Sequence, residues 1–318
     1  MPPVPPVPLS PIGFLGPHGT FTEQALLSQA DLARGELVPM ASISEVLSAT
    51  AGGGIALGFV PMENSIEGTV NVTLDTLAFE TDLLIQREVV VHVQLNLLVP
   101  KGSVLADVTT VVSMPHAAAQ VRRFLARELP GATTEAANST AEAARLVSER
   151  GEPGMAAVGT ALAAELYGLD VAATDIEDHP ENQTRFVVVA TEGVPAPTGH
   201  DKTTVVCFQR ADRPGSLLAI LQEFAARAVN LTKLESRPTK RSLGEYCFII
   251  DFEGHLADEL VADCLRDLKA KLANVKFLGS YPAAGHHGDT LRRDADAAWL
   301  AADRWLAGLR RGVVPRQP

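Results

Sequence analysis

The sequence predicts an α/β domain of two lobes, followed by a smaller α+β unit of the ferredoxin-like βαββαβ type. Short apolar runs alternate with helix-start signals from residue 12 to about residue 190, which is typical of α/β folds with largely parallel strands. Two longer β-rich runs interrupt that alternation, and a stretch rich in Pro and Gly precedes residues 203–282, where the order of elements changes. These observations indicate two lobes, a linker and a second domain.

The composition excludes several classes of protein. The chain has 318 residues, which suggests two domains, and 27 Lys and Arg against 38 Asp and Glu give a net charge of −11. Because binding to phosphate backbones needs a basic face, a nucleic-acid partner is not expected. Polar residues interrupt the longest apolar-rich stretch, 89–100, which is far shorter than a membrane-spanning helix. No membrane partner is expected either.

Cysteine usage and the N-terminus indicate a cytoplasmic protein. Cys207, Cys247 and Cys264 lack CxxC spacing, which fits buried thiols in a reducing compartment and offers no zinc site. Residues 1–11 contain five prolines before Ser10 and no basic residue, unlike a secretory signal. We interpret this segment as a disordered tail.

The first domain, residues 12–193, is justified by strand and helix-start signals in order. Strands are expected at 12–15, 38–40, 55–60, 108–112, 133–137 and 155–158. Capping boxes, in which Ser or Thr precedes Glu by three residues, begin helices at Thr20, Ser42 and Ser139. A helical stretch is expected to open within 61–68 and end near Phe79. Pro115 is expected in the first turn of a helix that continues past residue 121.

The β-rich runs 83–99 and 184–190 predict the passage between lobes. A sheet that leaves through the first run and returns through the second would make a second lobe of about 92–172, with a cleft between the lobes. Residues 194–202 contain Pro195, Pro197 and Gly199 and form the predicted linker.

Residues 203–282 contain the elements of the smaller domain. Strands are expected at 203–209, 231–237, 245–252 and 275–281, and helices at 217–228 and 256–272. Residues 283–318 form a predicted helical tail with Trp299 and Trp305, expected to pack on the body of the protein or on a partner chain.

Short polar residues follow several predicted strands, where α/β folds bind ligands. They are Thr20, Asn64, Ser65, Ser113, Ser139, Thr140 and Thr160. Together they suit a small anionic ligand, although each alone is also an ordinary helix cap. Nucleotide, zincin and hydrolase motifs are missing from the sequence, and His286–His287 is interpreted as a surface pair.

The segment 178–186 places a hydroxyl, a cation and an aromatic ring at the mouth of a buried strand. In a strand Thr184 and Phe186 share one face and Arg185 lies on the other. An arginine there either binds a carboxylate with two hydrogen bonds or lies on the surface of an edge strand.

Three segments resemble prephenate dehydratases: 16–21 (GPHGTF), 61–68 (PMENSIEG) and 182–186 (NQTRF). The C-terminal unit is similar to the ACT domain attached to that enzyme, through 213–218 (RPGSLL) and 235–238 (ESRP). The resemblance implies a type-II periplasmic-binding-protein-like catalytic domain and a homodimer or homotetramer. It also implies carbon–oxygen lyase activity on prephenate without cofactor or metal, and allosteric feedback by L-phenylalanine in phenylalanine biosynthesis. The turn that the family writes GALV is GSLL here, and the tail is not part of the pattern.

The same resemblance assigns roles to individual residues. Thr184 is the expected donor to the departing hydroxide, Arg185 is expected to orient a carboxylate or hold the segment rigid, and Glu63 is expected to position the site. Phe186 is expected to pack beneath the site. The expected substrate contacts are Thr20, Asn64, Ser65, Ser113, Gln120, Ser139 and Thr140. The expected effector site, between ACT units of neighbouring chains, comprises Pro214, Gly215, Ser216, Leu217, Asn230, Leu231, Glu235, Ser236, Arg237 and Pro238.

Two alternatives remain open from the sequence. Arogenate dehydratase has the same fold, and its substrate carries an amino group in place of the side-chain keto oxygen. A non-catalytic amino-acid-sensing protein would also combine a cleft with an ACT unit.

Overall fold

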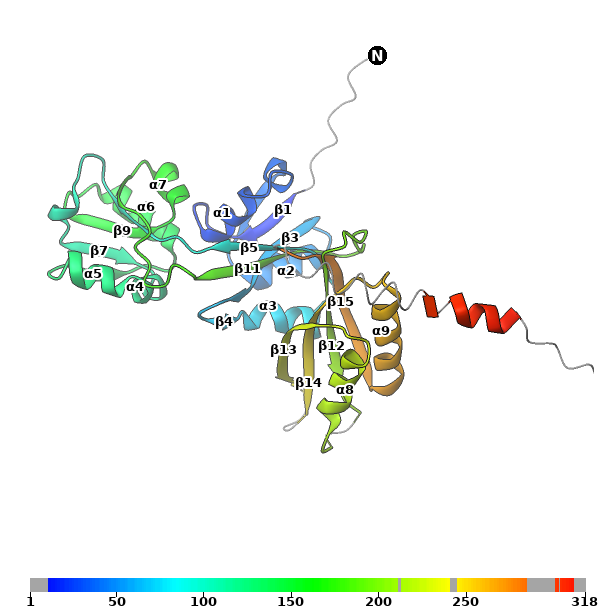
Figure 1. Ribbon diagram of the computed structural model, residues 1–318. Coiled ribbons are helices and arrows are strands. Elements are labelled where there is room, and N and C mark those ends of the chain that lie inside the picture. Colours follow the sequence, from blue (N-terminus) through cyan, green and yellow to red (C-terminus); the bar gives the residue numbers. More distant parts are fainter. Residues whose placement is uncertain (1–10, 211–212, 241–244, 285–300, 303, 312–318) are drawn as a thin grey trace, which may run out of the picture. The chain divides into compact units, whose positions relative to one another are not determined.

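The computed structural model describes residues 11–210, 213–240, 245–284, 301–302 and 304–311 (Figure 1). The chain divides into two compact units, one of residues 1–83 and 89–191, the other of residues 84–88 and 192–318. Nearly all of the predicted tail 1–11, together with Trp299 and the pair His286–His287, lies outside the described residues. The described tail residues 301–302 and 304–311 are helical, and Trp305 is 65% exposed.

One mixed sheet forms the first lobe, with strand order β2-β1-β3-β11-β5 and β4 paired to β3. Its strands are β1 (Ile12–Leu15), β2 (Leu37–Met40), β3 (Leu57–Asn64), β4 (Gly68–Thr69), β5 (Leu84–His92) and β11 (Gln183–Ala190). Its helices are α1 (Phe21–Leu27), α2 (Ile43–Ala51) and α3 (Asn71–Asp75), with a short 3-10 helix at Leu32–Arg34 and a π turn at Thr76–Glu80. Phe59 and Phe186 stack in its core with ring centroids 5.1 Å apart.

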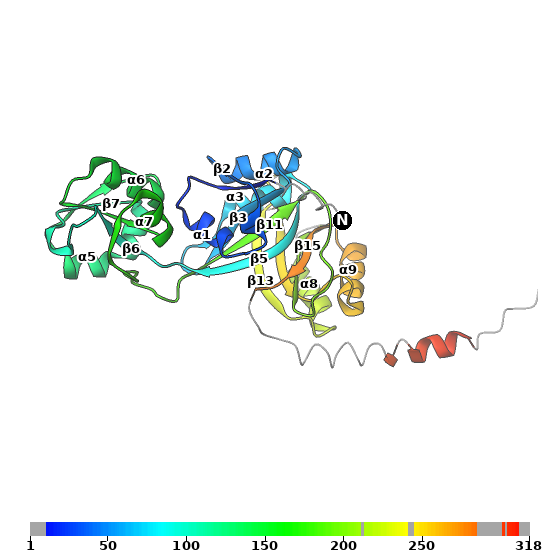
Figure 2. The ribbon, with the colours of Figure 1, turned by 90° about the horizontal axis from the view of Figure 1, so that it is seen from above.

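A second sheet forms the other lobe, with strand order β10-β6-β9-β7-β8. The strands are β6 (Asn96–Val99), β7 (Thr110–Ser113), β8 (Thr133–Ala136), β9 (Met155–Gly159) and β10 (Asp170–Ala173). The helices are α4 (Pro115–Gln120), α5 (Arg122–Glu128), α6 (Thr140–Arg150) and α7 (Ala161–Tyr167), with a 3-10 turn at Leu105–Asp107. Figure 2 shows the two segments that join the lobes, one leaving β5 and one entering β11. The predicted two-lobed architecture is confirmed.

The C-terminal sheet is antiparallel with strand order β13-β14-β12-β15. Its elements are β12 (Asp201–Phe208), α8 (Ser216–Ala225), β13 (Leu231–Pro238), β14 (Tyr246–Glu253), α9 (Glu259–Lys271) and β15 (Asn274–Pro282). Both helices pack on this sheet through a shared core that includes Phe224, Phe252 and Leu268. The predicted βαββαβ unit is confirmed.

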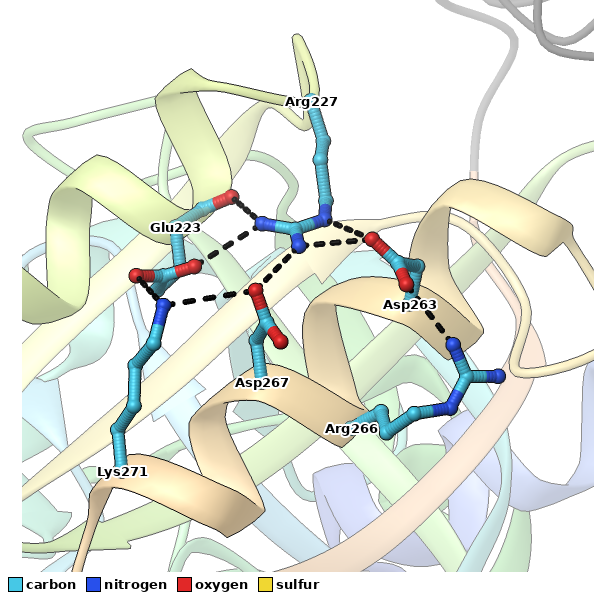
Figure 3. Close-up of polar contacts among 6 residues, drawn as sticks. All are labelled: Glu223, Arg227, Asp263, Arg266, Asp267 and Lys271. Carbon is cyan, nitrogen blue, oxygen red and sulfur yellow. Dashed lines mark hydrogen bonds and ion pairs between the residues drawn. The ribbon is translucent and has the colours of Figure 1, made fainter. Parts of the chain in front are cut away.

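Arg227, just after α8, ties that helix to α9 (Figure 3). Its guanidinium bonds Asp267 at 2.6 Å, Asp263 at 2.8 Å and Glu223 at 3.0 Å. Burial opposes the charge, but these hydrogen bonds outweigh it and raise the pKa of Arg227. The cluster therefore fixes the packing of the two helices that cover the sheet.

Two local predictions were wrong. A helix was expected to open within residues 61–68, but residues 61–64 continue β3, β4 follows at Gly68–Thr69, and helix α3 begins only at Asn71. The predicted helix through residue 121 is broken there into α4 and α5, because Val121 has φ −118° and ψ 15°, outside the helical region.

The N-caps of the three predicted capping boxes are present. The backbone N–H groups of Glu23, Glu45 and Glu142 donate to the hydroxyls of Thr20, Ser42 and Ser139 at 3.4, 3.1 and 3.0 Å. All three cysteines are free and buried, as predicted. Within the residues that the structure describes, every helix is too short or too polar to span a membrane.

Candidate active site

A cavity of about 700 Å³ lies between the two lobes of the first unit. This volume suits a small-molecule ligand. Many lining side chains carry hydroxyl or amide groups, and others are apolar, including Phe21, Val93 and Leu95. The predicted site residues that line it are Thr20, Asn64, Gln120, Ser139, Thr140, Thr184 and Phe186.

The turn after β1 brings backbone into this cavity. Gly16, Pro17 and Thr20 line it, and the Thr20 hydroxyl donates to the Leu15 carbonyl at 3.2 Å. Gly19 has φ +86°, a conformation that an L side chain adopts only with strain. Its carbonyl accepts from the Thr160 hydroxyl of the other lobe at 2.8 Å. Thr160 therefore joins the lobes beside the cavity, which it does not line.

Asn64, at the end of β3, organises the polar wall of the cavity. Its Oδ1 accepts from the backbone N–H groups of Ile66 and Glu67, both at 3.0 Å. The amide orientation follows from these two donors, so Nδ2 must be the donor. Nδ2 lies 2.9 Å from Asn182 Oδ1 and 2.9 Å from Thr184 Oγ1.

The Thr184 hydroxyl is set up as a hydrogen-bond donor. Thr184 pairs with Asn64 across β11 and β3, and its Oγ1 accepts from the Asn64 amide. Because a hydroxyl has one hydrogen, accepting from Asn64 leaves that hydrogen to be donated elsewhere, and Thr184 lines the cavity. Phe186, on the same face, is 2% exposed and stacks on Phe59, so it forms the packed floor.

Arg185 and Glu63 do not line the cavity. They pair across β11 and β3, with Arg185 Nη1 3.6 Å from Glu63 Oε2, and the Arg185 side chain is 11% exposed. Strand alternation turns them to the face opposite Thr184 and Asn64. The geometry favours the expected role of Arg185 in holding the segment rigid over direct contact with a ligand.

Ser65 and Ser113, two further predicted contacts, also lie outside the lining. The Ser65 hydroxyl donates to Asn182 Oδ1 at 3.2 Å and accepts from the Gln183 N–H at 3.0 Å, so it braces the segment before Thr184. Ser113, at the end of β7, is fully buried and donates to the Met114 carbonyl at 3.0 Å.

Side chains of the two lobes contact each other within the lining of the cavity. Glu67 Oε1 lies against His116 Nε2 and accepts from Gln120 Nε2 at 3.1 Å. Gln120 Oε1 in turn accepts from Asn182 Nδ2 at 3.4 Å. Asn182 is 1% exposed and contacts both lobes, because its Oδ1 accepts from Asn64 of the first lobe and its Nδ2 donates to Gln120 of the second.

The N-terminal part of α6 and its cap contribute further polar side chains to the lining. Ser139, Thr140, Glu142 and Arg145 all line the cavity. The first N–H groups of a helix lack intrahelical partners and favour anions. The hydrogen bond to Glu149 raises the pKa of Arg145, which stays charged at any working pH.

Seven polar lining residues were not among the predicted site residues: Thr22, Glu67, His116, Asn138, Glu142, Arg145 and Asn182. Glu67 and Asn182 were inside the quoted segments 61–68 and 182–186. His116 and Arg145 carry no local signal, because only the approach of the second lobe brings them to the cavity.

A separate cavity of about 630 Å³ lies in the C-terminal unit. Pro214, Gly215 and Ser216 of the predicted effector site line it, together with Arg210 and Lys271. Leu217 lines a neighbouring hollow. The other predicted effector residues lie along β13 and just before it, and line neither hollow: Asn230, Leu231, Glu235, Ser236, Arg237 and Pro238.

The fold and cavity define a two-lobed domain of the type-II periplasmic-binding-protein kind, joined to a ferredoxin-like domain. Residues 12–194 match the family model described as prephenate dehydratase, and residues 203–270 match the ACT domain model. The chain belongs to the prephenate dehydratase family.

Individual relatives agree over nearly the whole chain. Prephenate dehydratase of Mycolicibacterium vanbaalenii is 43% identical, covering 95% of this chain and 98% of its own. The crystal structure of prephenate dehydratase from Arthrobacter aurescens in complex with L-Phe is 39% identical with a TM-score of 0.85, covering 95% of this chain and 99% of that one. A structure described as GqqA, a quorum quenching acylase, is 30% identical with a TM-score of 0.76. The match covers 86% of this chain and 98% of that one.

Proposed function

We propose that this protein is a prephenate dehydratase, a carbon–oxygen lyase that converts prephenate to phenylpyruvate in phenylalanine biosynthesis. One observation carries the proposal. The Thr184 hydroxyl accepts a hydrogen bond from Asn64 and thereby keeps its own hydrogen for an acceptor in the cavity. That arrangement suits the polarisation of a leaving hydroxyl group.

The reaction balances with one proton taken up. The bond from the ring to its carboxylate breaks and releases CO2, and the electron pair moves into the ring. The ring carbon–oxygen bond breaks, and the departing hydroxide takes a proton to leave as water. Aromatisation supplies the driving force, so the protein's tasks are to orient the ring and to stabilise the departing oxygen.

Thr184 donates to the departing oxygen in this mechanism. A threonine hydroxyl is a weak acid in water, so its contribution is a preorganised hydrogen bond that strengthens as negative charge develops. Asn64 and Asn182 hold that hydroxyl in place through the Asn64 amide. Phe186 and the apolar walls give the ring a packed surface.

Turnover of purified protein with prephenate and, separately, with arogenate tests the proposal. We expect phenylpyruvate from prephenate, with kcat/KM at least tenfold above that for arogenate. The reverse preference would make the chain an arogenate dehydratase. Turnover of neither substrate, with binding of an amino acid retained, would make it a sensor.

We propose further that L-phenylalanine regulates the enzyme through the ACT domain, in an oligomer located in the cytoplasm. The complex of the Arthrobacter aurescens relative with L-Phe supports an effector role for this amino acid. The turn Pro214–Ser216 lines a cavity together with three cationic residues, Arg210, Arg213 and Lys271, which suits an amino-acid carboxylate. Calorimetry with L-phenylalanine, combined with sedimentation, tests this; absence of binding would remove the regulatory role.

A further inference from the structure

The charges around the cavity do not match those of a dianionic substrate, which raises the question of what binds its carboxylates. Four ionisable side chains are found among the described lining residues: Glu67, His116, Glu142 and Arg145. Of these, Arg145 alone carries a permanent positive charge. Arg185 lies on the other face of β11 beside Glu63.

Arg145 lines the cavity from α6, and one end of its guanidinium is held by Glu149. Nη1 bonds both carboxylate oxygens of Glu149 at 2.7 Å. Nη2 is 3.8 Å from Glu142 Oε1, which is longer than a hydrogen bond. The other Glu142 oxygen accepts from the Asn138 N–H at 2.7 Å, so this carboxylate already serves the start of the helix.

We propose that Arg145 is a substrate-binding residue that anchors the side-chain carboxylate of prephenate, the one that the product retains. This inference rests on the proposed function. The N-cap and first turn of α6, from which Ser139 and Thr140 line the same cavity, add hydroxyl groups and N–H donors.

The choice between the two carboxylates follows from the chemistry. The ring carboxylate loses its charge as CO2 leaves. A cation bound to it would stabilise the ground state more than the transition state and slow the reaction. A cation on the side-chain carboxylate stabilises both states equally, because that group does not change. Arg145 on the side-chain carboxylate therefore lowers KM without opposing decarboxylation.

The test compares Arg145→Gln with Arg150→Gln on the same helix. Arg150 pairs with Glu135 through two hydrogen bonds at 2.7 and 2.8 Å and does not line the cavity. The readouts are kcat and KM for prephenate and the inhibition constant of phenylpyruvate. Phenylpyruvate is the product, and it keeps only the side-chain carboxylate. Arg145→Lys serves as a second variant that keeps the charge.

For Arg145→Gln we expect KM to rise about 10- to 100-fold, because a hydrogen bond to a charged group is lost. We expect kcat to stay within a few-fold of wild type. The inhibition constant of phenylpyruvate should rise by the same factor. Arg145→Lys should recover part of the loss, and Arg150→Gln should match wild type.

Other outcomes overturn the inference. An unchanged KM in Arg145→Gln would exclude the contact. A raised KM with an unchanged phenylpyruvate constant would assign Arg145 to the departing carboxylate. A wild-type protein that does not turn over prephenate refutes the proposed function instead; in that case calorimetry with phenylpyruvate on wild type and Arg145→Gln still decides the role of Arg145.

Discussion

Replacing Thr184 with valine removes one hydroxyl from the cavity and tests the mechanism most directly. Valine has nearly the same shape, so the packing around β11 is kept. Asn64 Nδ2 loses one acceptor but still lies 2.9 Å from Asn182 Oδ1 and 3.2 Å from the Gln183 carbonyl. The Asn64 amide therefore keeps hydrogen-bond acceptors in the variant. We expect the free energy of unfolding to fall by about 1 kcal/mol and Tm to fall by about 2–4 °C.

The catalytic effect should be much larger than the effect on stability. Loss of one preorganised donor to a developing oxyanion typically lowers kcat by about 10²- to 10³-fold, or about 2.7–4 kcal/mol in the barrier. KM should change little, because the donor acts mainly in the transition state. The assay is phenylpyruvate formation at saturating prephenate, with circular dichroism to establish that the variant is folded.

Thr184→Ser is the matched control, since it keeps the hydroxyl and loses a methyl group. We expect it to retain most of the activity. A valine variant within a few-fold of wild-type kcat would remove Thr184 from the mechanism. A serine variant as inactive as the valine variant would assign the loss to packing of the methyl group.

Further predictions concern the C-terminal unit. Arg227→Met leaves the acidic groups around it without their shared cation, so we expect Tm to fall by about 5 °C at pH 7. Arg227 lowers the pKa of Asp267. The difference in Tm between variant and wild type should therefore narrow below about pH 4, where that carboxylate takes up a proton. Gly215→Ala forces φ +83° on an L residue at a position with open space around it, and we expect L-phenylalanine binding, measured by calorimetry, to weaken about fivefold from strain of about 1 kcal/mol. Burial raises the pKa of Cys207 and of Cys264 to about 12, so neither should be alkylated at pH 8 without denaturant, as mass spectrometry would show. Stability should also fall above about pH 9, because unfolded thiols lose protons that folded ones keep.

The starts of α1, α2 and α6 could be predicted from the sequence because their determinants are local. Thr20, Ser42 and Ser139 each accept a hydrogen bond from a residue three positions later. The order of strands and helices likewise predicted the α/β class of the first domain and the α+β class of the C-terminal domain. The continuation of β3 through Pro61 could not be predicted, since proline is rare inside sheets. Pro61 is tolerated because the register between β3 and β11 shifts at Arg185 and Phe186.

Site residues that lie within a sequence motif could be predicted, whereas those that reach the cavity only through packing of the two lobes could not. Asn64 and Thr184 lie in two recognisable segments, and their contact spans 120 positions in sequence. No local pattern indicates that Glu67 meets His116, or that Arg145 faces the same cavity. The pairing of the lobes decides these contacts, so they follow only from the folded structure.

Thr184, Arg185 and Phe186 are consecutive on β11 but have different roles, because they lie on different faces of the sheet. Alternation sends Thr184 and Phe186 to the cavity and Arg185 to Glu63 on the other face. A slip of one residue between β11 and β3 would exchange the faces and remove the hydroxyl from the cavity. The pair between Arg185 and Glu63 opposes that slip, because moving Arg185 would separate its charge from a nearby carboxylate. Since the same fold occurs in a protein described as an acylase, the fold alone does not determine the chemistry. In this chain the proposed chemistry depends on the register that keeps Thr184 beside Asn64.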